Sequence, residues 1–143
     1  MAAVGIAFLY LAWFLSWFGT FATTCTGSDP KSLAGGLVLS VGPYLVSFAC
    51  LRFARINPLG LIVALPLMLL LVRQAYWGAQ LFIVVTVNGR SACSHMFGEE
   101  FGPSQGGWLE QVYAPYYLFV SLGAIAALGY AHWCHWQERQ STA

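Results

Sequence analysis

The fold is decided by residues 59–87, whose sequence is LGLIVALPLMLLLVRQAYWGAQLFIVVTV. An α-helix rises 1.5 Å per residue, so the roughly 30 Å hydrocarbon core of a bilayer needs about 20 residues. This stretch has 29 residues. Its first half carries no polar side chain, whereas a long helix of a soluble protein would show a polar stripe along one side. The sequence therefore predicts a membrane-spanning helix here.

Polar residues interrupt this helix near its middle. Insertion of an arginine at the centre of such a helix costs about 2.5 kcal/mol or more, so Arg73 is expected to face protein, a cavity or a lipid headgroup. Helical projection places Arg73, Tyr76, Trp77 and Gln80 on one side, and Gln74 follows Arg73 directly. These five residues form the candidate intramembrane polar site or subunit contact. The alternative is that Arg73 extends to the outer interface, where Tyr76 and Trp77 belong to an aromatic belt.

The predicted spans contain no acidic side chain that could neutralise Arg73. A lipid phosphate, a bound anion or the acid of another subunit is therefore the expected partner of its guanidinium. A rival within the chain is Glu99 or Glu100, folded down onto Arg73 from the following loop. The five carboxylates of the chain all lie outside the predicted spans: Asp29, Glu99, Glu100, Glu110 and Glu138.

The composition of the whole chain indicates one membrane-embedded domain, residues 1–143. It is 59% hydrophobic and only 8% charged, with a mean hydropathy of +0.68. Ordinary soluble domains are about one quarter charged, which excludes that class. A net charge of +1 and the absence of any run of Lys or Arg argue against nucleic acid as a partner and leave membrane lipids as the expected surroundings.

We predict an all-α, polytopic membrane protein with four transmembrane helices in a compact bundle. Short loops and the Arg52/Arg55 pair indicate that both termini are cytoplasmic, in an integral membrane protein of a bacterial inner membrane. The four spans are expected at about 2–23, 32–53, 59–87 and 112–133, with outer loops at 24–31 and 88–111.

The four cysteines of the chain form no CxxC pair. In the predicted topology Cys25 and Cys93 lie in the two outer loops, while Cys50 and Cys134 lie toward the inner side. Two loop cysteines on one side of an oxidising membrane face predict a Cys25–Cys93 disulfide that joins the two outer loops. A quinone-linked thiol oxidase would need a CxxC on the outer side, so this class is disfavoured.

No catalytic or cofactor site can be assigned from the sequence. Cys93, His95 and Met96 offer ligands for copper or zinc, but their spacing matches no specific metal site, so we predict neither a metal nor a cofactor. His132 and His135 could share a metal on one helical face. No phosphate loop or nucleophile motif is present, and the sequence therefore favours a protein that is not an enzyme.

The favoured function is to act by contact with another membrane protein. Four short-looped helices with many aromatic residues are typical of an accessory subunit of a membrane complex, or of a small protector of the toxin-immunity kind, the latter by analogy of size and topology alone. The alternative is a homo-oligomeric transporter or channel for an anion or amphiphile, with the polar residues around Arg73 along its pathway. Another membrane subunit or a second copy of the chain is the expected partner.

Overall fold

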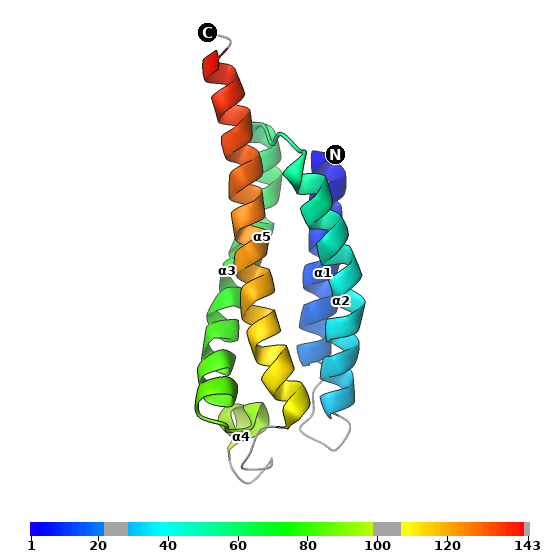
Figure 1. The fold of residues 1–143 in the computed structure, drawn as a ribbon, viewed down its shortest axis with the longest axis vertical. Coiled ribbons are helices and arrows are strands. Elements are labelled where there is room, and N and C mark those ends of the chain that lie inside the picture. Colours follow the sequence, from blue (N-terminus) through cyan, green and yellow to red (C-terminus); the bar gives the residue numbers. More distant parts are fainter. Residues whose placement is uncertain (22–28, 99–106, 142–143) are drawn as a thin grey trace.

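The structure is a computed structural model that describes residues 1–21, 29–98 and 107–141. Four long helices form a bundle, as the sequence predicts (Figure 1). In chain order the elements are α1 (Ala2–Phe21), α2 (Asp29–Arg52), α3 (Pro58–Leu81), the π-helical turn η1 (Phe82–Val87), α4 (Ala92–Phe97) and α5 (Trp108–Ser141).

The four long helices are apolar enough to cross a membrane, and many of their large hydrophobic side chains are exposed. Candidate spans cover Ala2–Thr20, Ala34–Arg52, Pro58–Val87 and Trp108–Ser141. Large hydrophobic side chains such as Val38, Leu59 and Ile62 are about two thirds exposed or more. A surface of this kind is suited to lipid and not to water. The chain is thus an integral membrane protein by the length and composition of its helices.

The helix boundaries follow local chemistry as well as hydropathy. At the start of α3, the side chain of Asn57 accepts a hydrogen bond from Gly60 N at 2.7 Å, and Pro58 occupies the first turn, where a missing N–H does no harm. Ser91 caps α4 in the same way through Cys93 N. The described part of the expected polar loop at 88–111 therefore includes the short helix α4.

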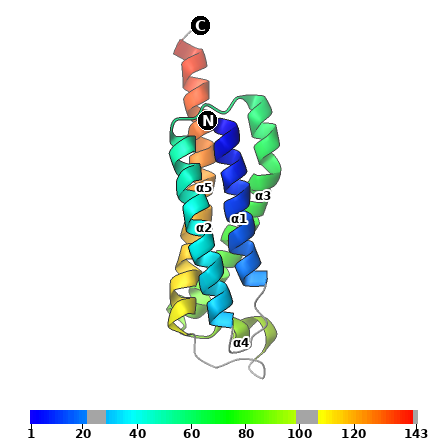
Figure 2. The same ribbon diagram turned by 90° about the vertical axis from the view of Figure 1, so that its right-hand side faces the viewer.

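The last helix differs from its predicted extent. α5 has 34 residues, begins at Trp108 and ends at Ser141, whereas we expected a span at about 112–133. Pro115 consequently lies inside the helix and not in its first turn. Figures 1 and 2 show that the C-terminal part of α5 projects beyond the other helices at the end of the bundle where the N-terminus also lies. α4 lies at the opposite end.

Two close helix pairs make up the bundle. α1 packs mainly on α2 and α3 mainly on α5, while α2 and α5 join the two pairs and α1 touches α3 at few points. Glycines bring the paired helices together: a Cβ on Gly19 would lie 2.8 Å from Gly36 Cα, and a Cβ on Gly78 would lie 2.8 Å from Leu118 Cα. Such small-residue contacts are the usual way in which membrane helices approach closely.

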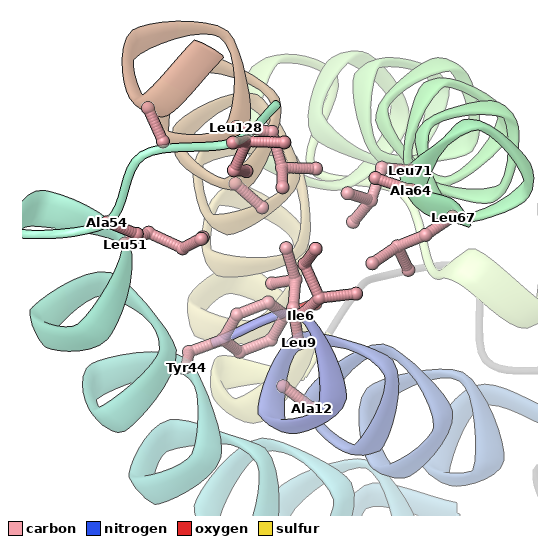
Figure 3. Close-up of a cluster of buried hydrophobic side chains, with 13 residues drawn as sticks. Ile6, Leu9, Ala12, Tyr44, Leu51, Ala54, Ala64, Leu67, Leu71 and Leu128 are labelled. Carbon is pink, nitrogen blue, oxygen red and sulfur yellow. The ribbon is translucent and has the colours of Figure 1, made fainter. Parts of the chain in front are cut away.

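The main apolar core lies between all four long helices. Figure 3 shows side chains from α1, α2, α3 and α5 that point into this shared interior. Leu9, Leu67, Leu71 and Leu128 are fully buried there. A second, smaller cluster lies nearer α4 and includes Leu81 and Val85 from the end of α3 and η1.

Candidate functional site

The predicted polar site divides into two environments in the structure. Arg73 is exposed on the outward side of α3, with Tyr76 62% and Trp77 39% exposed beside it and Gln80 half-buried. Gln74 is 2% exposed and turns into the bundle. A rotation of 100° per residue separates these neighbours. The structure therefore keeps Arg73, Tyr76, Trp77 and Gln80 on one side and places Gln74 in the interior.

Arg73 has no ion pair or hydrogen bond with the residues that the structure describes, although it lies within electrostatic range of the buried Tyr117 hydroxyl. Glu110 is in the first turn of α5 and Glu138 near its other end, both far along the bundle axis from the middle of α3. The suggested contact of Arg73 with Glu99 or Glu100 lies outside the described residues, so it stays untested.

Gln74 ties three helices together. Its amide nitrogen donates to Ser16 Oγ on α1 and to Tyr44 Oη on α2, at 3.3 Å in each case. Ser16 and Tyr44 are buried as well. These bonds cross between the two helix pairs at a level where α1 and α3 otherwise make few contacts. Gln74 is thus part of the interior that fixes the packing of the bundle.

A column of hydroxyl groups continues from Gln74 toward the end of the bundle that carries α4. The Tyr113 hydroxyl donates to Ser16 O at 2.8 Å and also bonds the Thr20 hydroxyl. Nearby, Ser40 Oγ and Tyr116 Oη lie 2.9 Å apart. Polar side chains of this kind join membrane helices because lipid offers them no alternative partner.

The sequence analysis missed this column, although a signal for it exists. Ser16 and Thr20, Ser40 and Tyr44, and Tyr113 and Tyr117 are each separated by four residues, so each pair lies on one helical face. None of these residues belongs to the predicted polar site, which lies on residues 73–80 alone. Their partners lie on other helices, which helical spacing alone cannot identify.

At the end of the bundle that holds the termini, the connection between α2 and α3 is fastened to α5. Ile56 N donates to Ala131 O at 3.3 Å, and His132 Nδ1 donates to Ile56 O at 3.1 Å. Arg55 Nε also bonds Glu138 Oε1 at 2.6 Å, and this carboxylate raises the pKa of the exposed guanidinium. The hydrogen bond of His132 thus fastens α5 to the connection between α2 and α3.

Of the other predicted residues, Cys93 and His95 lie in α4, where Cys93 is 5% exposed and His95 is exposed. The Met96 side chain lies outside the described part of the structure. Within that part, no group of three or more His, Cys, Asp or Glu side chains is placed to hold a metal ion. Cys25 also lies outside the described residues, so the Cys25–Cys93 disulfide stays a prediction. Cys50 and Cys134 are free thiols.

A shallow pocket of about 400 Å³ lies on the surface of α5, against Gly129, His132, Trp133 and Trp136. All four residues belong to one helix, and both tryptophans are about half exposed. Tryptophan is enriched where a helix crosses the membrane–water interface. This pocket is therefore consistent with an interfacial surface of the projecting helix and carries no recognisable chemistry.

Comparison of the chain with protein-family models, with curated proteins and with solved structures gave no match. The functional argument accordingly rests on the residues described above.

Proposed function

We propose that this chain is a non-enzymatic integral membrane protein that acts by contact, as an accessory subunit of a membrane complex or a small toxin-immunity-like protector. The observation that carries the proposal is the environment of Arg73. Its side chain is exposed at the middle of the 30-residue segment Pro58–Val87, on a surface that is otherwise apolar. An arginine exposed to hydrocarbon costs about 2.5–3.5 kcal/mol on insertion scales.

The arrangement of the interior supports a function at the surface. Ser16, Ser40 and Tyr44 are buried, and each contacts a polar side chain of another helix, so these polar groups hold helices together. The interior also contains fully buried leucines from α1, α3 and α5, which close it to ions. The polar groups of α3 that are free to meet another molecule are consequently those around Arg73.

The chemistry of the partner follows from the acids of the chain. No carboxylate belongs to the middle of a span, so a second copy would have no acid at the depth of Arg73. We therefore propose a different membrane protein whose helix carries an acidic residue at that depth. Tyr76 and Trp77 would pack beside the ion pair and exclude lipid from it. Exclusion of lipid and water strengthens an ion pair because the local dielectric constant is low.

Arg73→Gln tests this proposal. Truncation of one member of a desolvated charge pair costs about 2–5 kcal/mol, so the amount of co-purified partner should fall tenfold or more. Arg52→Gln is the matched control, because Arg52 is also exposed but lies at the end of α2 over the Phe53 ring. Equal partner recovery with both variants would contradict the proposal. Selective loss of bound anionic lipid from Arg73→Gln, with the partner retained, would assign Arg73 to the lipid interface.

Transport is the second candidate, and the same exposed polar group favours it. If several copies met through the outward face of α3, Arg73, Tyr76, Trp77 and Gln80 would line the space between them. A purified homo-oligomer that conducts anions in liposomes, with conduction lost in Arg73→Gln, would replace the contact function with this one.

The proposed setting is a bacterial inner membrane with both termini in the cytoplasm. Support comes from Arg52 and Arg55, which lie at the same end of the bundle as the two termini. The α4 end would then face an oxidising compartment, where the proposed Cys25–Cys93 disulfide is stable.

A further inference from the structure

Gln74 Oε1 is a buried acceptor without a hydrogen-bond partner among the described residues. The residue is 2% exposed, and the atom lies where α1, α2 and α3 meet. Buried polar atoms of native proteins nearly always have a partner, which is either a protein group or a bound molecule. The unpartnered oxygen therefore marks a place to look for a ligand.

The hydrogen bonds around Gln74 fix the orientation of its amide group. Ser16 Oγ has one proton, and it donates this proton to Trp13 O at 2.9 Å. Ser16 Oγ can then only accept, so the group that faces it must be the amide nitrogen of Gln74. A rotated amide would place two acceptors against each other. Oε1 is consequently the amide atom that takes part in neither of these two bonds.

A ligand at this site must supply hydrogen-bond donors. Ser16 Oγ and Tyr44 Oη lie 3.5 Å apart, and because the Ser16 proton is already used, Tyr44 is the donor of that contact. All four available protons, two from Gln74 and one from each hydroxyl, are thus committed. The acceptors that remain are Oε1 and one lone pair of Tyr44 Oη. The site lacks donors, so it excludes anions and other ligands that only accept.

The ligand must also be small and uncharged. No carboxylate among the described residues is near enough to balance a cation, since Glu110 and Glu138 lie close to the two ends of α5. Burial of an unbalanced charge at this depth would be costly. Water is the smallest neutral donor, and it needs only two to four polar partners and roughly 10–15 Å³ of space.

We propose that Gln74 is a binding site for an internal water molecule that donates to Gln74 Oε1 and to Tyr44 Oη. The hydroxyl column lies on one side of this site. Thr20 is half-buried near the end of α1, and the Thr20–Tyr113–Ser16 contacts lead from it to Gln74. On the other side, the fully buried leucines of the main core close the interior (Figure 3). The site is thus bounded by hydroxyl groups on one side and by apolar side chains on the other, and it does not depend on the proposed contact function.

Magnetisation transfer from water to the Gln74 side-chain amide tests the proposal in the intact chain. The protein is labelled with ¹⁵N-glutamine and placed in nanodiscs, so that no substitution is needed. A bound water lies close to the amide protons on the Oε1 side and should give a Gln74–water cross-peak of the sign typical of a long-lived contact. A Gln74 amide with cross-peaks to protein protons alone would overturn the proposal.

Two variants separate a specific water from general hydration. Tyr44→Phe removes the second acceptor and one bond to the Gln74 amide, so the water cross-peak should lose most of its intensity. Ser47→Ala is the control, because Ser47 is an equally buried hydroxyl of α2 that donates to Gly5 O at 2.8 Å and takes no part in the site. Equal intensity in both variants would contradict the proposed water bridge between Gln74 and Tyr44.

Discussion

Arg73 and Gln74 are consecutive residues of α3 with opposite surroundings, and this difference assigns them opposite roles. Arg73 is exposed and is available to another molecule, whereas Gln74 is buried and joins α3 to α1 and α2. An interhelical hydrogen bond in a membrane contributes about 0.6 kcal/mol on average and up to about 2 kcal/mol. Gln74 makes two such bonds, so it is expected to contribute more to stability than any neighbour on the outward face.

Replacement of Gln74 by leucine should therefore lower the free energy of unfolding by about 1–3 kcal/mol, since two donors are lost and the Tyr44 and Ser16 oxygens lose a partner. Gln80→Leu makes the same chemical change on the same helix, at a half-buried position on its outward side. Its free energy of unfolding should stay within about 0.5 kcal/mol of the wild-type value. Tryptophan fluorescence during an SDS titration measures both. A loss of stability in Gln80→Leu as large as that in Gln74→Leu would show that the buried bonds are not decisive.

At this scale the sequence was informative about which side of α3 each residue occupies, and uninformative about partners. Helical projection places Arg73, Tyr76, Trp77 and Gln80 on one side because it depends on one helix alone, whereas the prediction included Gln74 in the same site and the structure places it in the interior. The bonds from Gln74 to Ser16 and Tyr44 depend on how three helices pack, and the residues concerned are 58 and 30 positions away. The sequence shows only that Ser16 and Thr20 are four residues apart. This spacing predicts that they share one face of α1, but it does not predict which helix that face contacts.

At the scale of elements, hydropathy predicts the existence of the four long helices but not their ends. α5 continues to Ser141 through polar residues that a hydropathy pattern assigns to the aqueous side, because a helix does not stop where the bilayer stops. The same limit applies to α4, a six-residue helix whose start is fixed by the Ser91 side chain. The side chains that fix the start or end of a helix at these two positions can be identified only in the structure.

The backbones of α1 and α2 approach closely at Gly19 and Gly36, and this contact provides a test with adjacent residues. A Cβ on Gly36 would lie 2.7 Å from Gly19 Cα, whereas a Cβ on the neighbouring Gly35 would meet nothing within 4 Å. Gly36→Ala should thus destabilise the protein by about 1–3 kcal/mol through overpacking against backbone. Gly35→Ala should be neutral, or should stabilise by up to about 1 kcal/mol because alanine favours a helix. Similar unfolding midpoints for the two variants would contradict this account of helix pairing.

At the scale of the whole molecule, the bundle has two chemically different ends. One end carries both termini, the connection between α2 and α3, and the Arg55–Glu138 ion pair. The other end carries α4 with the buried Cys93. The helices alternate in direction, so the fold is the same whichever way the bundle is inserted. The fold alone therefore does not determine which end faces the cytoplasm. Arginine content favours the end with the termini.

The cysteines of the chain report on both this orientation and the proposed disulfide. Cys50 and Cys134 are free and belong to the half of the bundle that holds the termini. Alkylation in SDS without reductant should therefore modify two thiols per chain, and prior reduction should raise the number to four, since Cys25 and Cys93 would be released from their bridge. Cys134 lies two residues beyond His132, which bonds the connection between α2 and α3, so a membrane-impermeant maleimide should modify it in inside-out vesicles and not in intact cells. Four reactive thiols before reduction would remove the disulfide, and modification of Cys134 in intact cells would reverse the orientation. The two results are independent, because a reduced Cys25–Cys93 pair leaves the position of Cys134 unchanged.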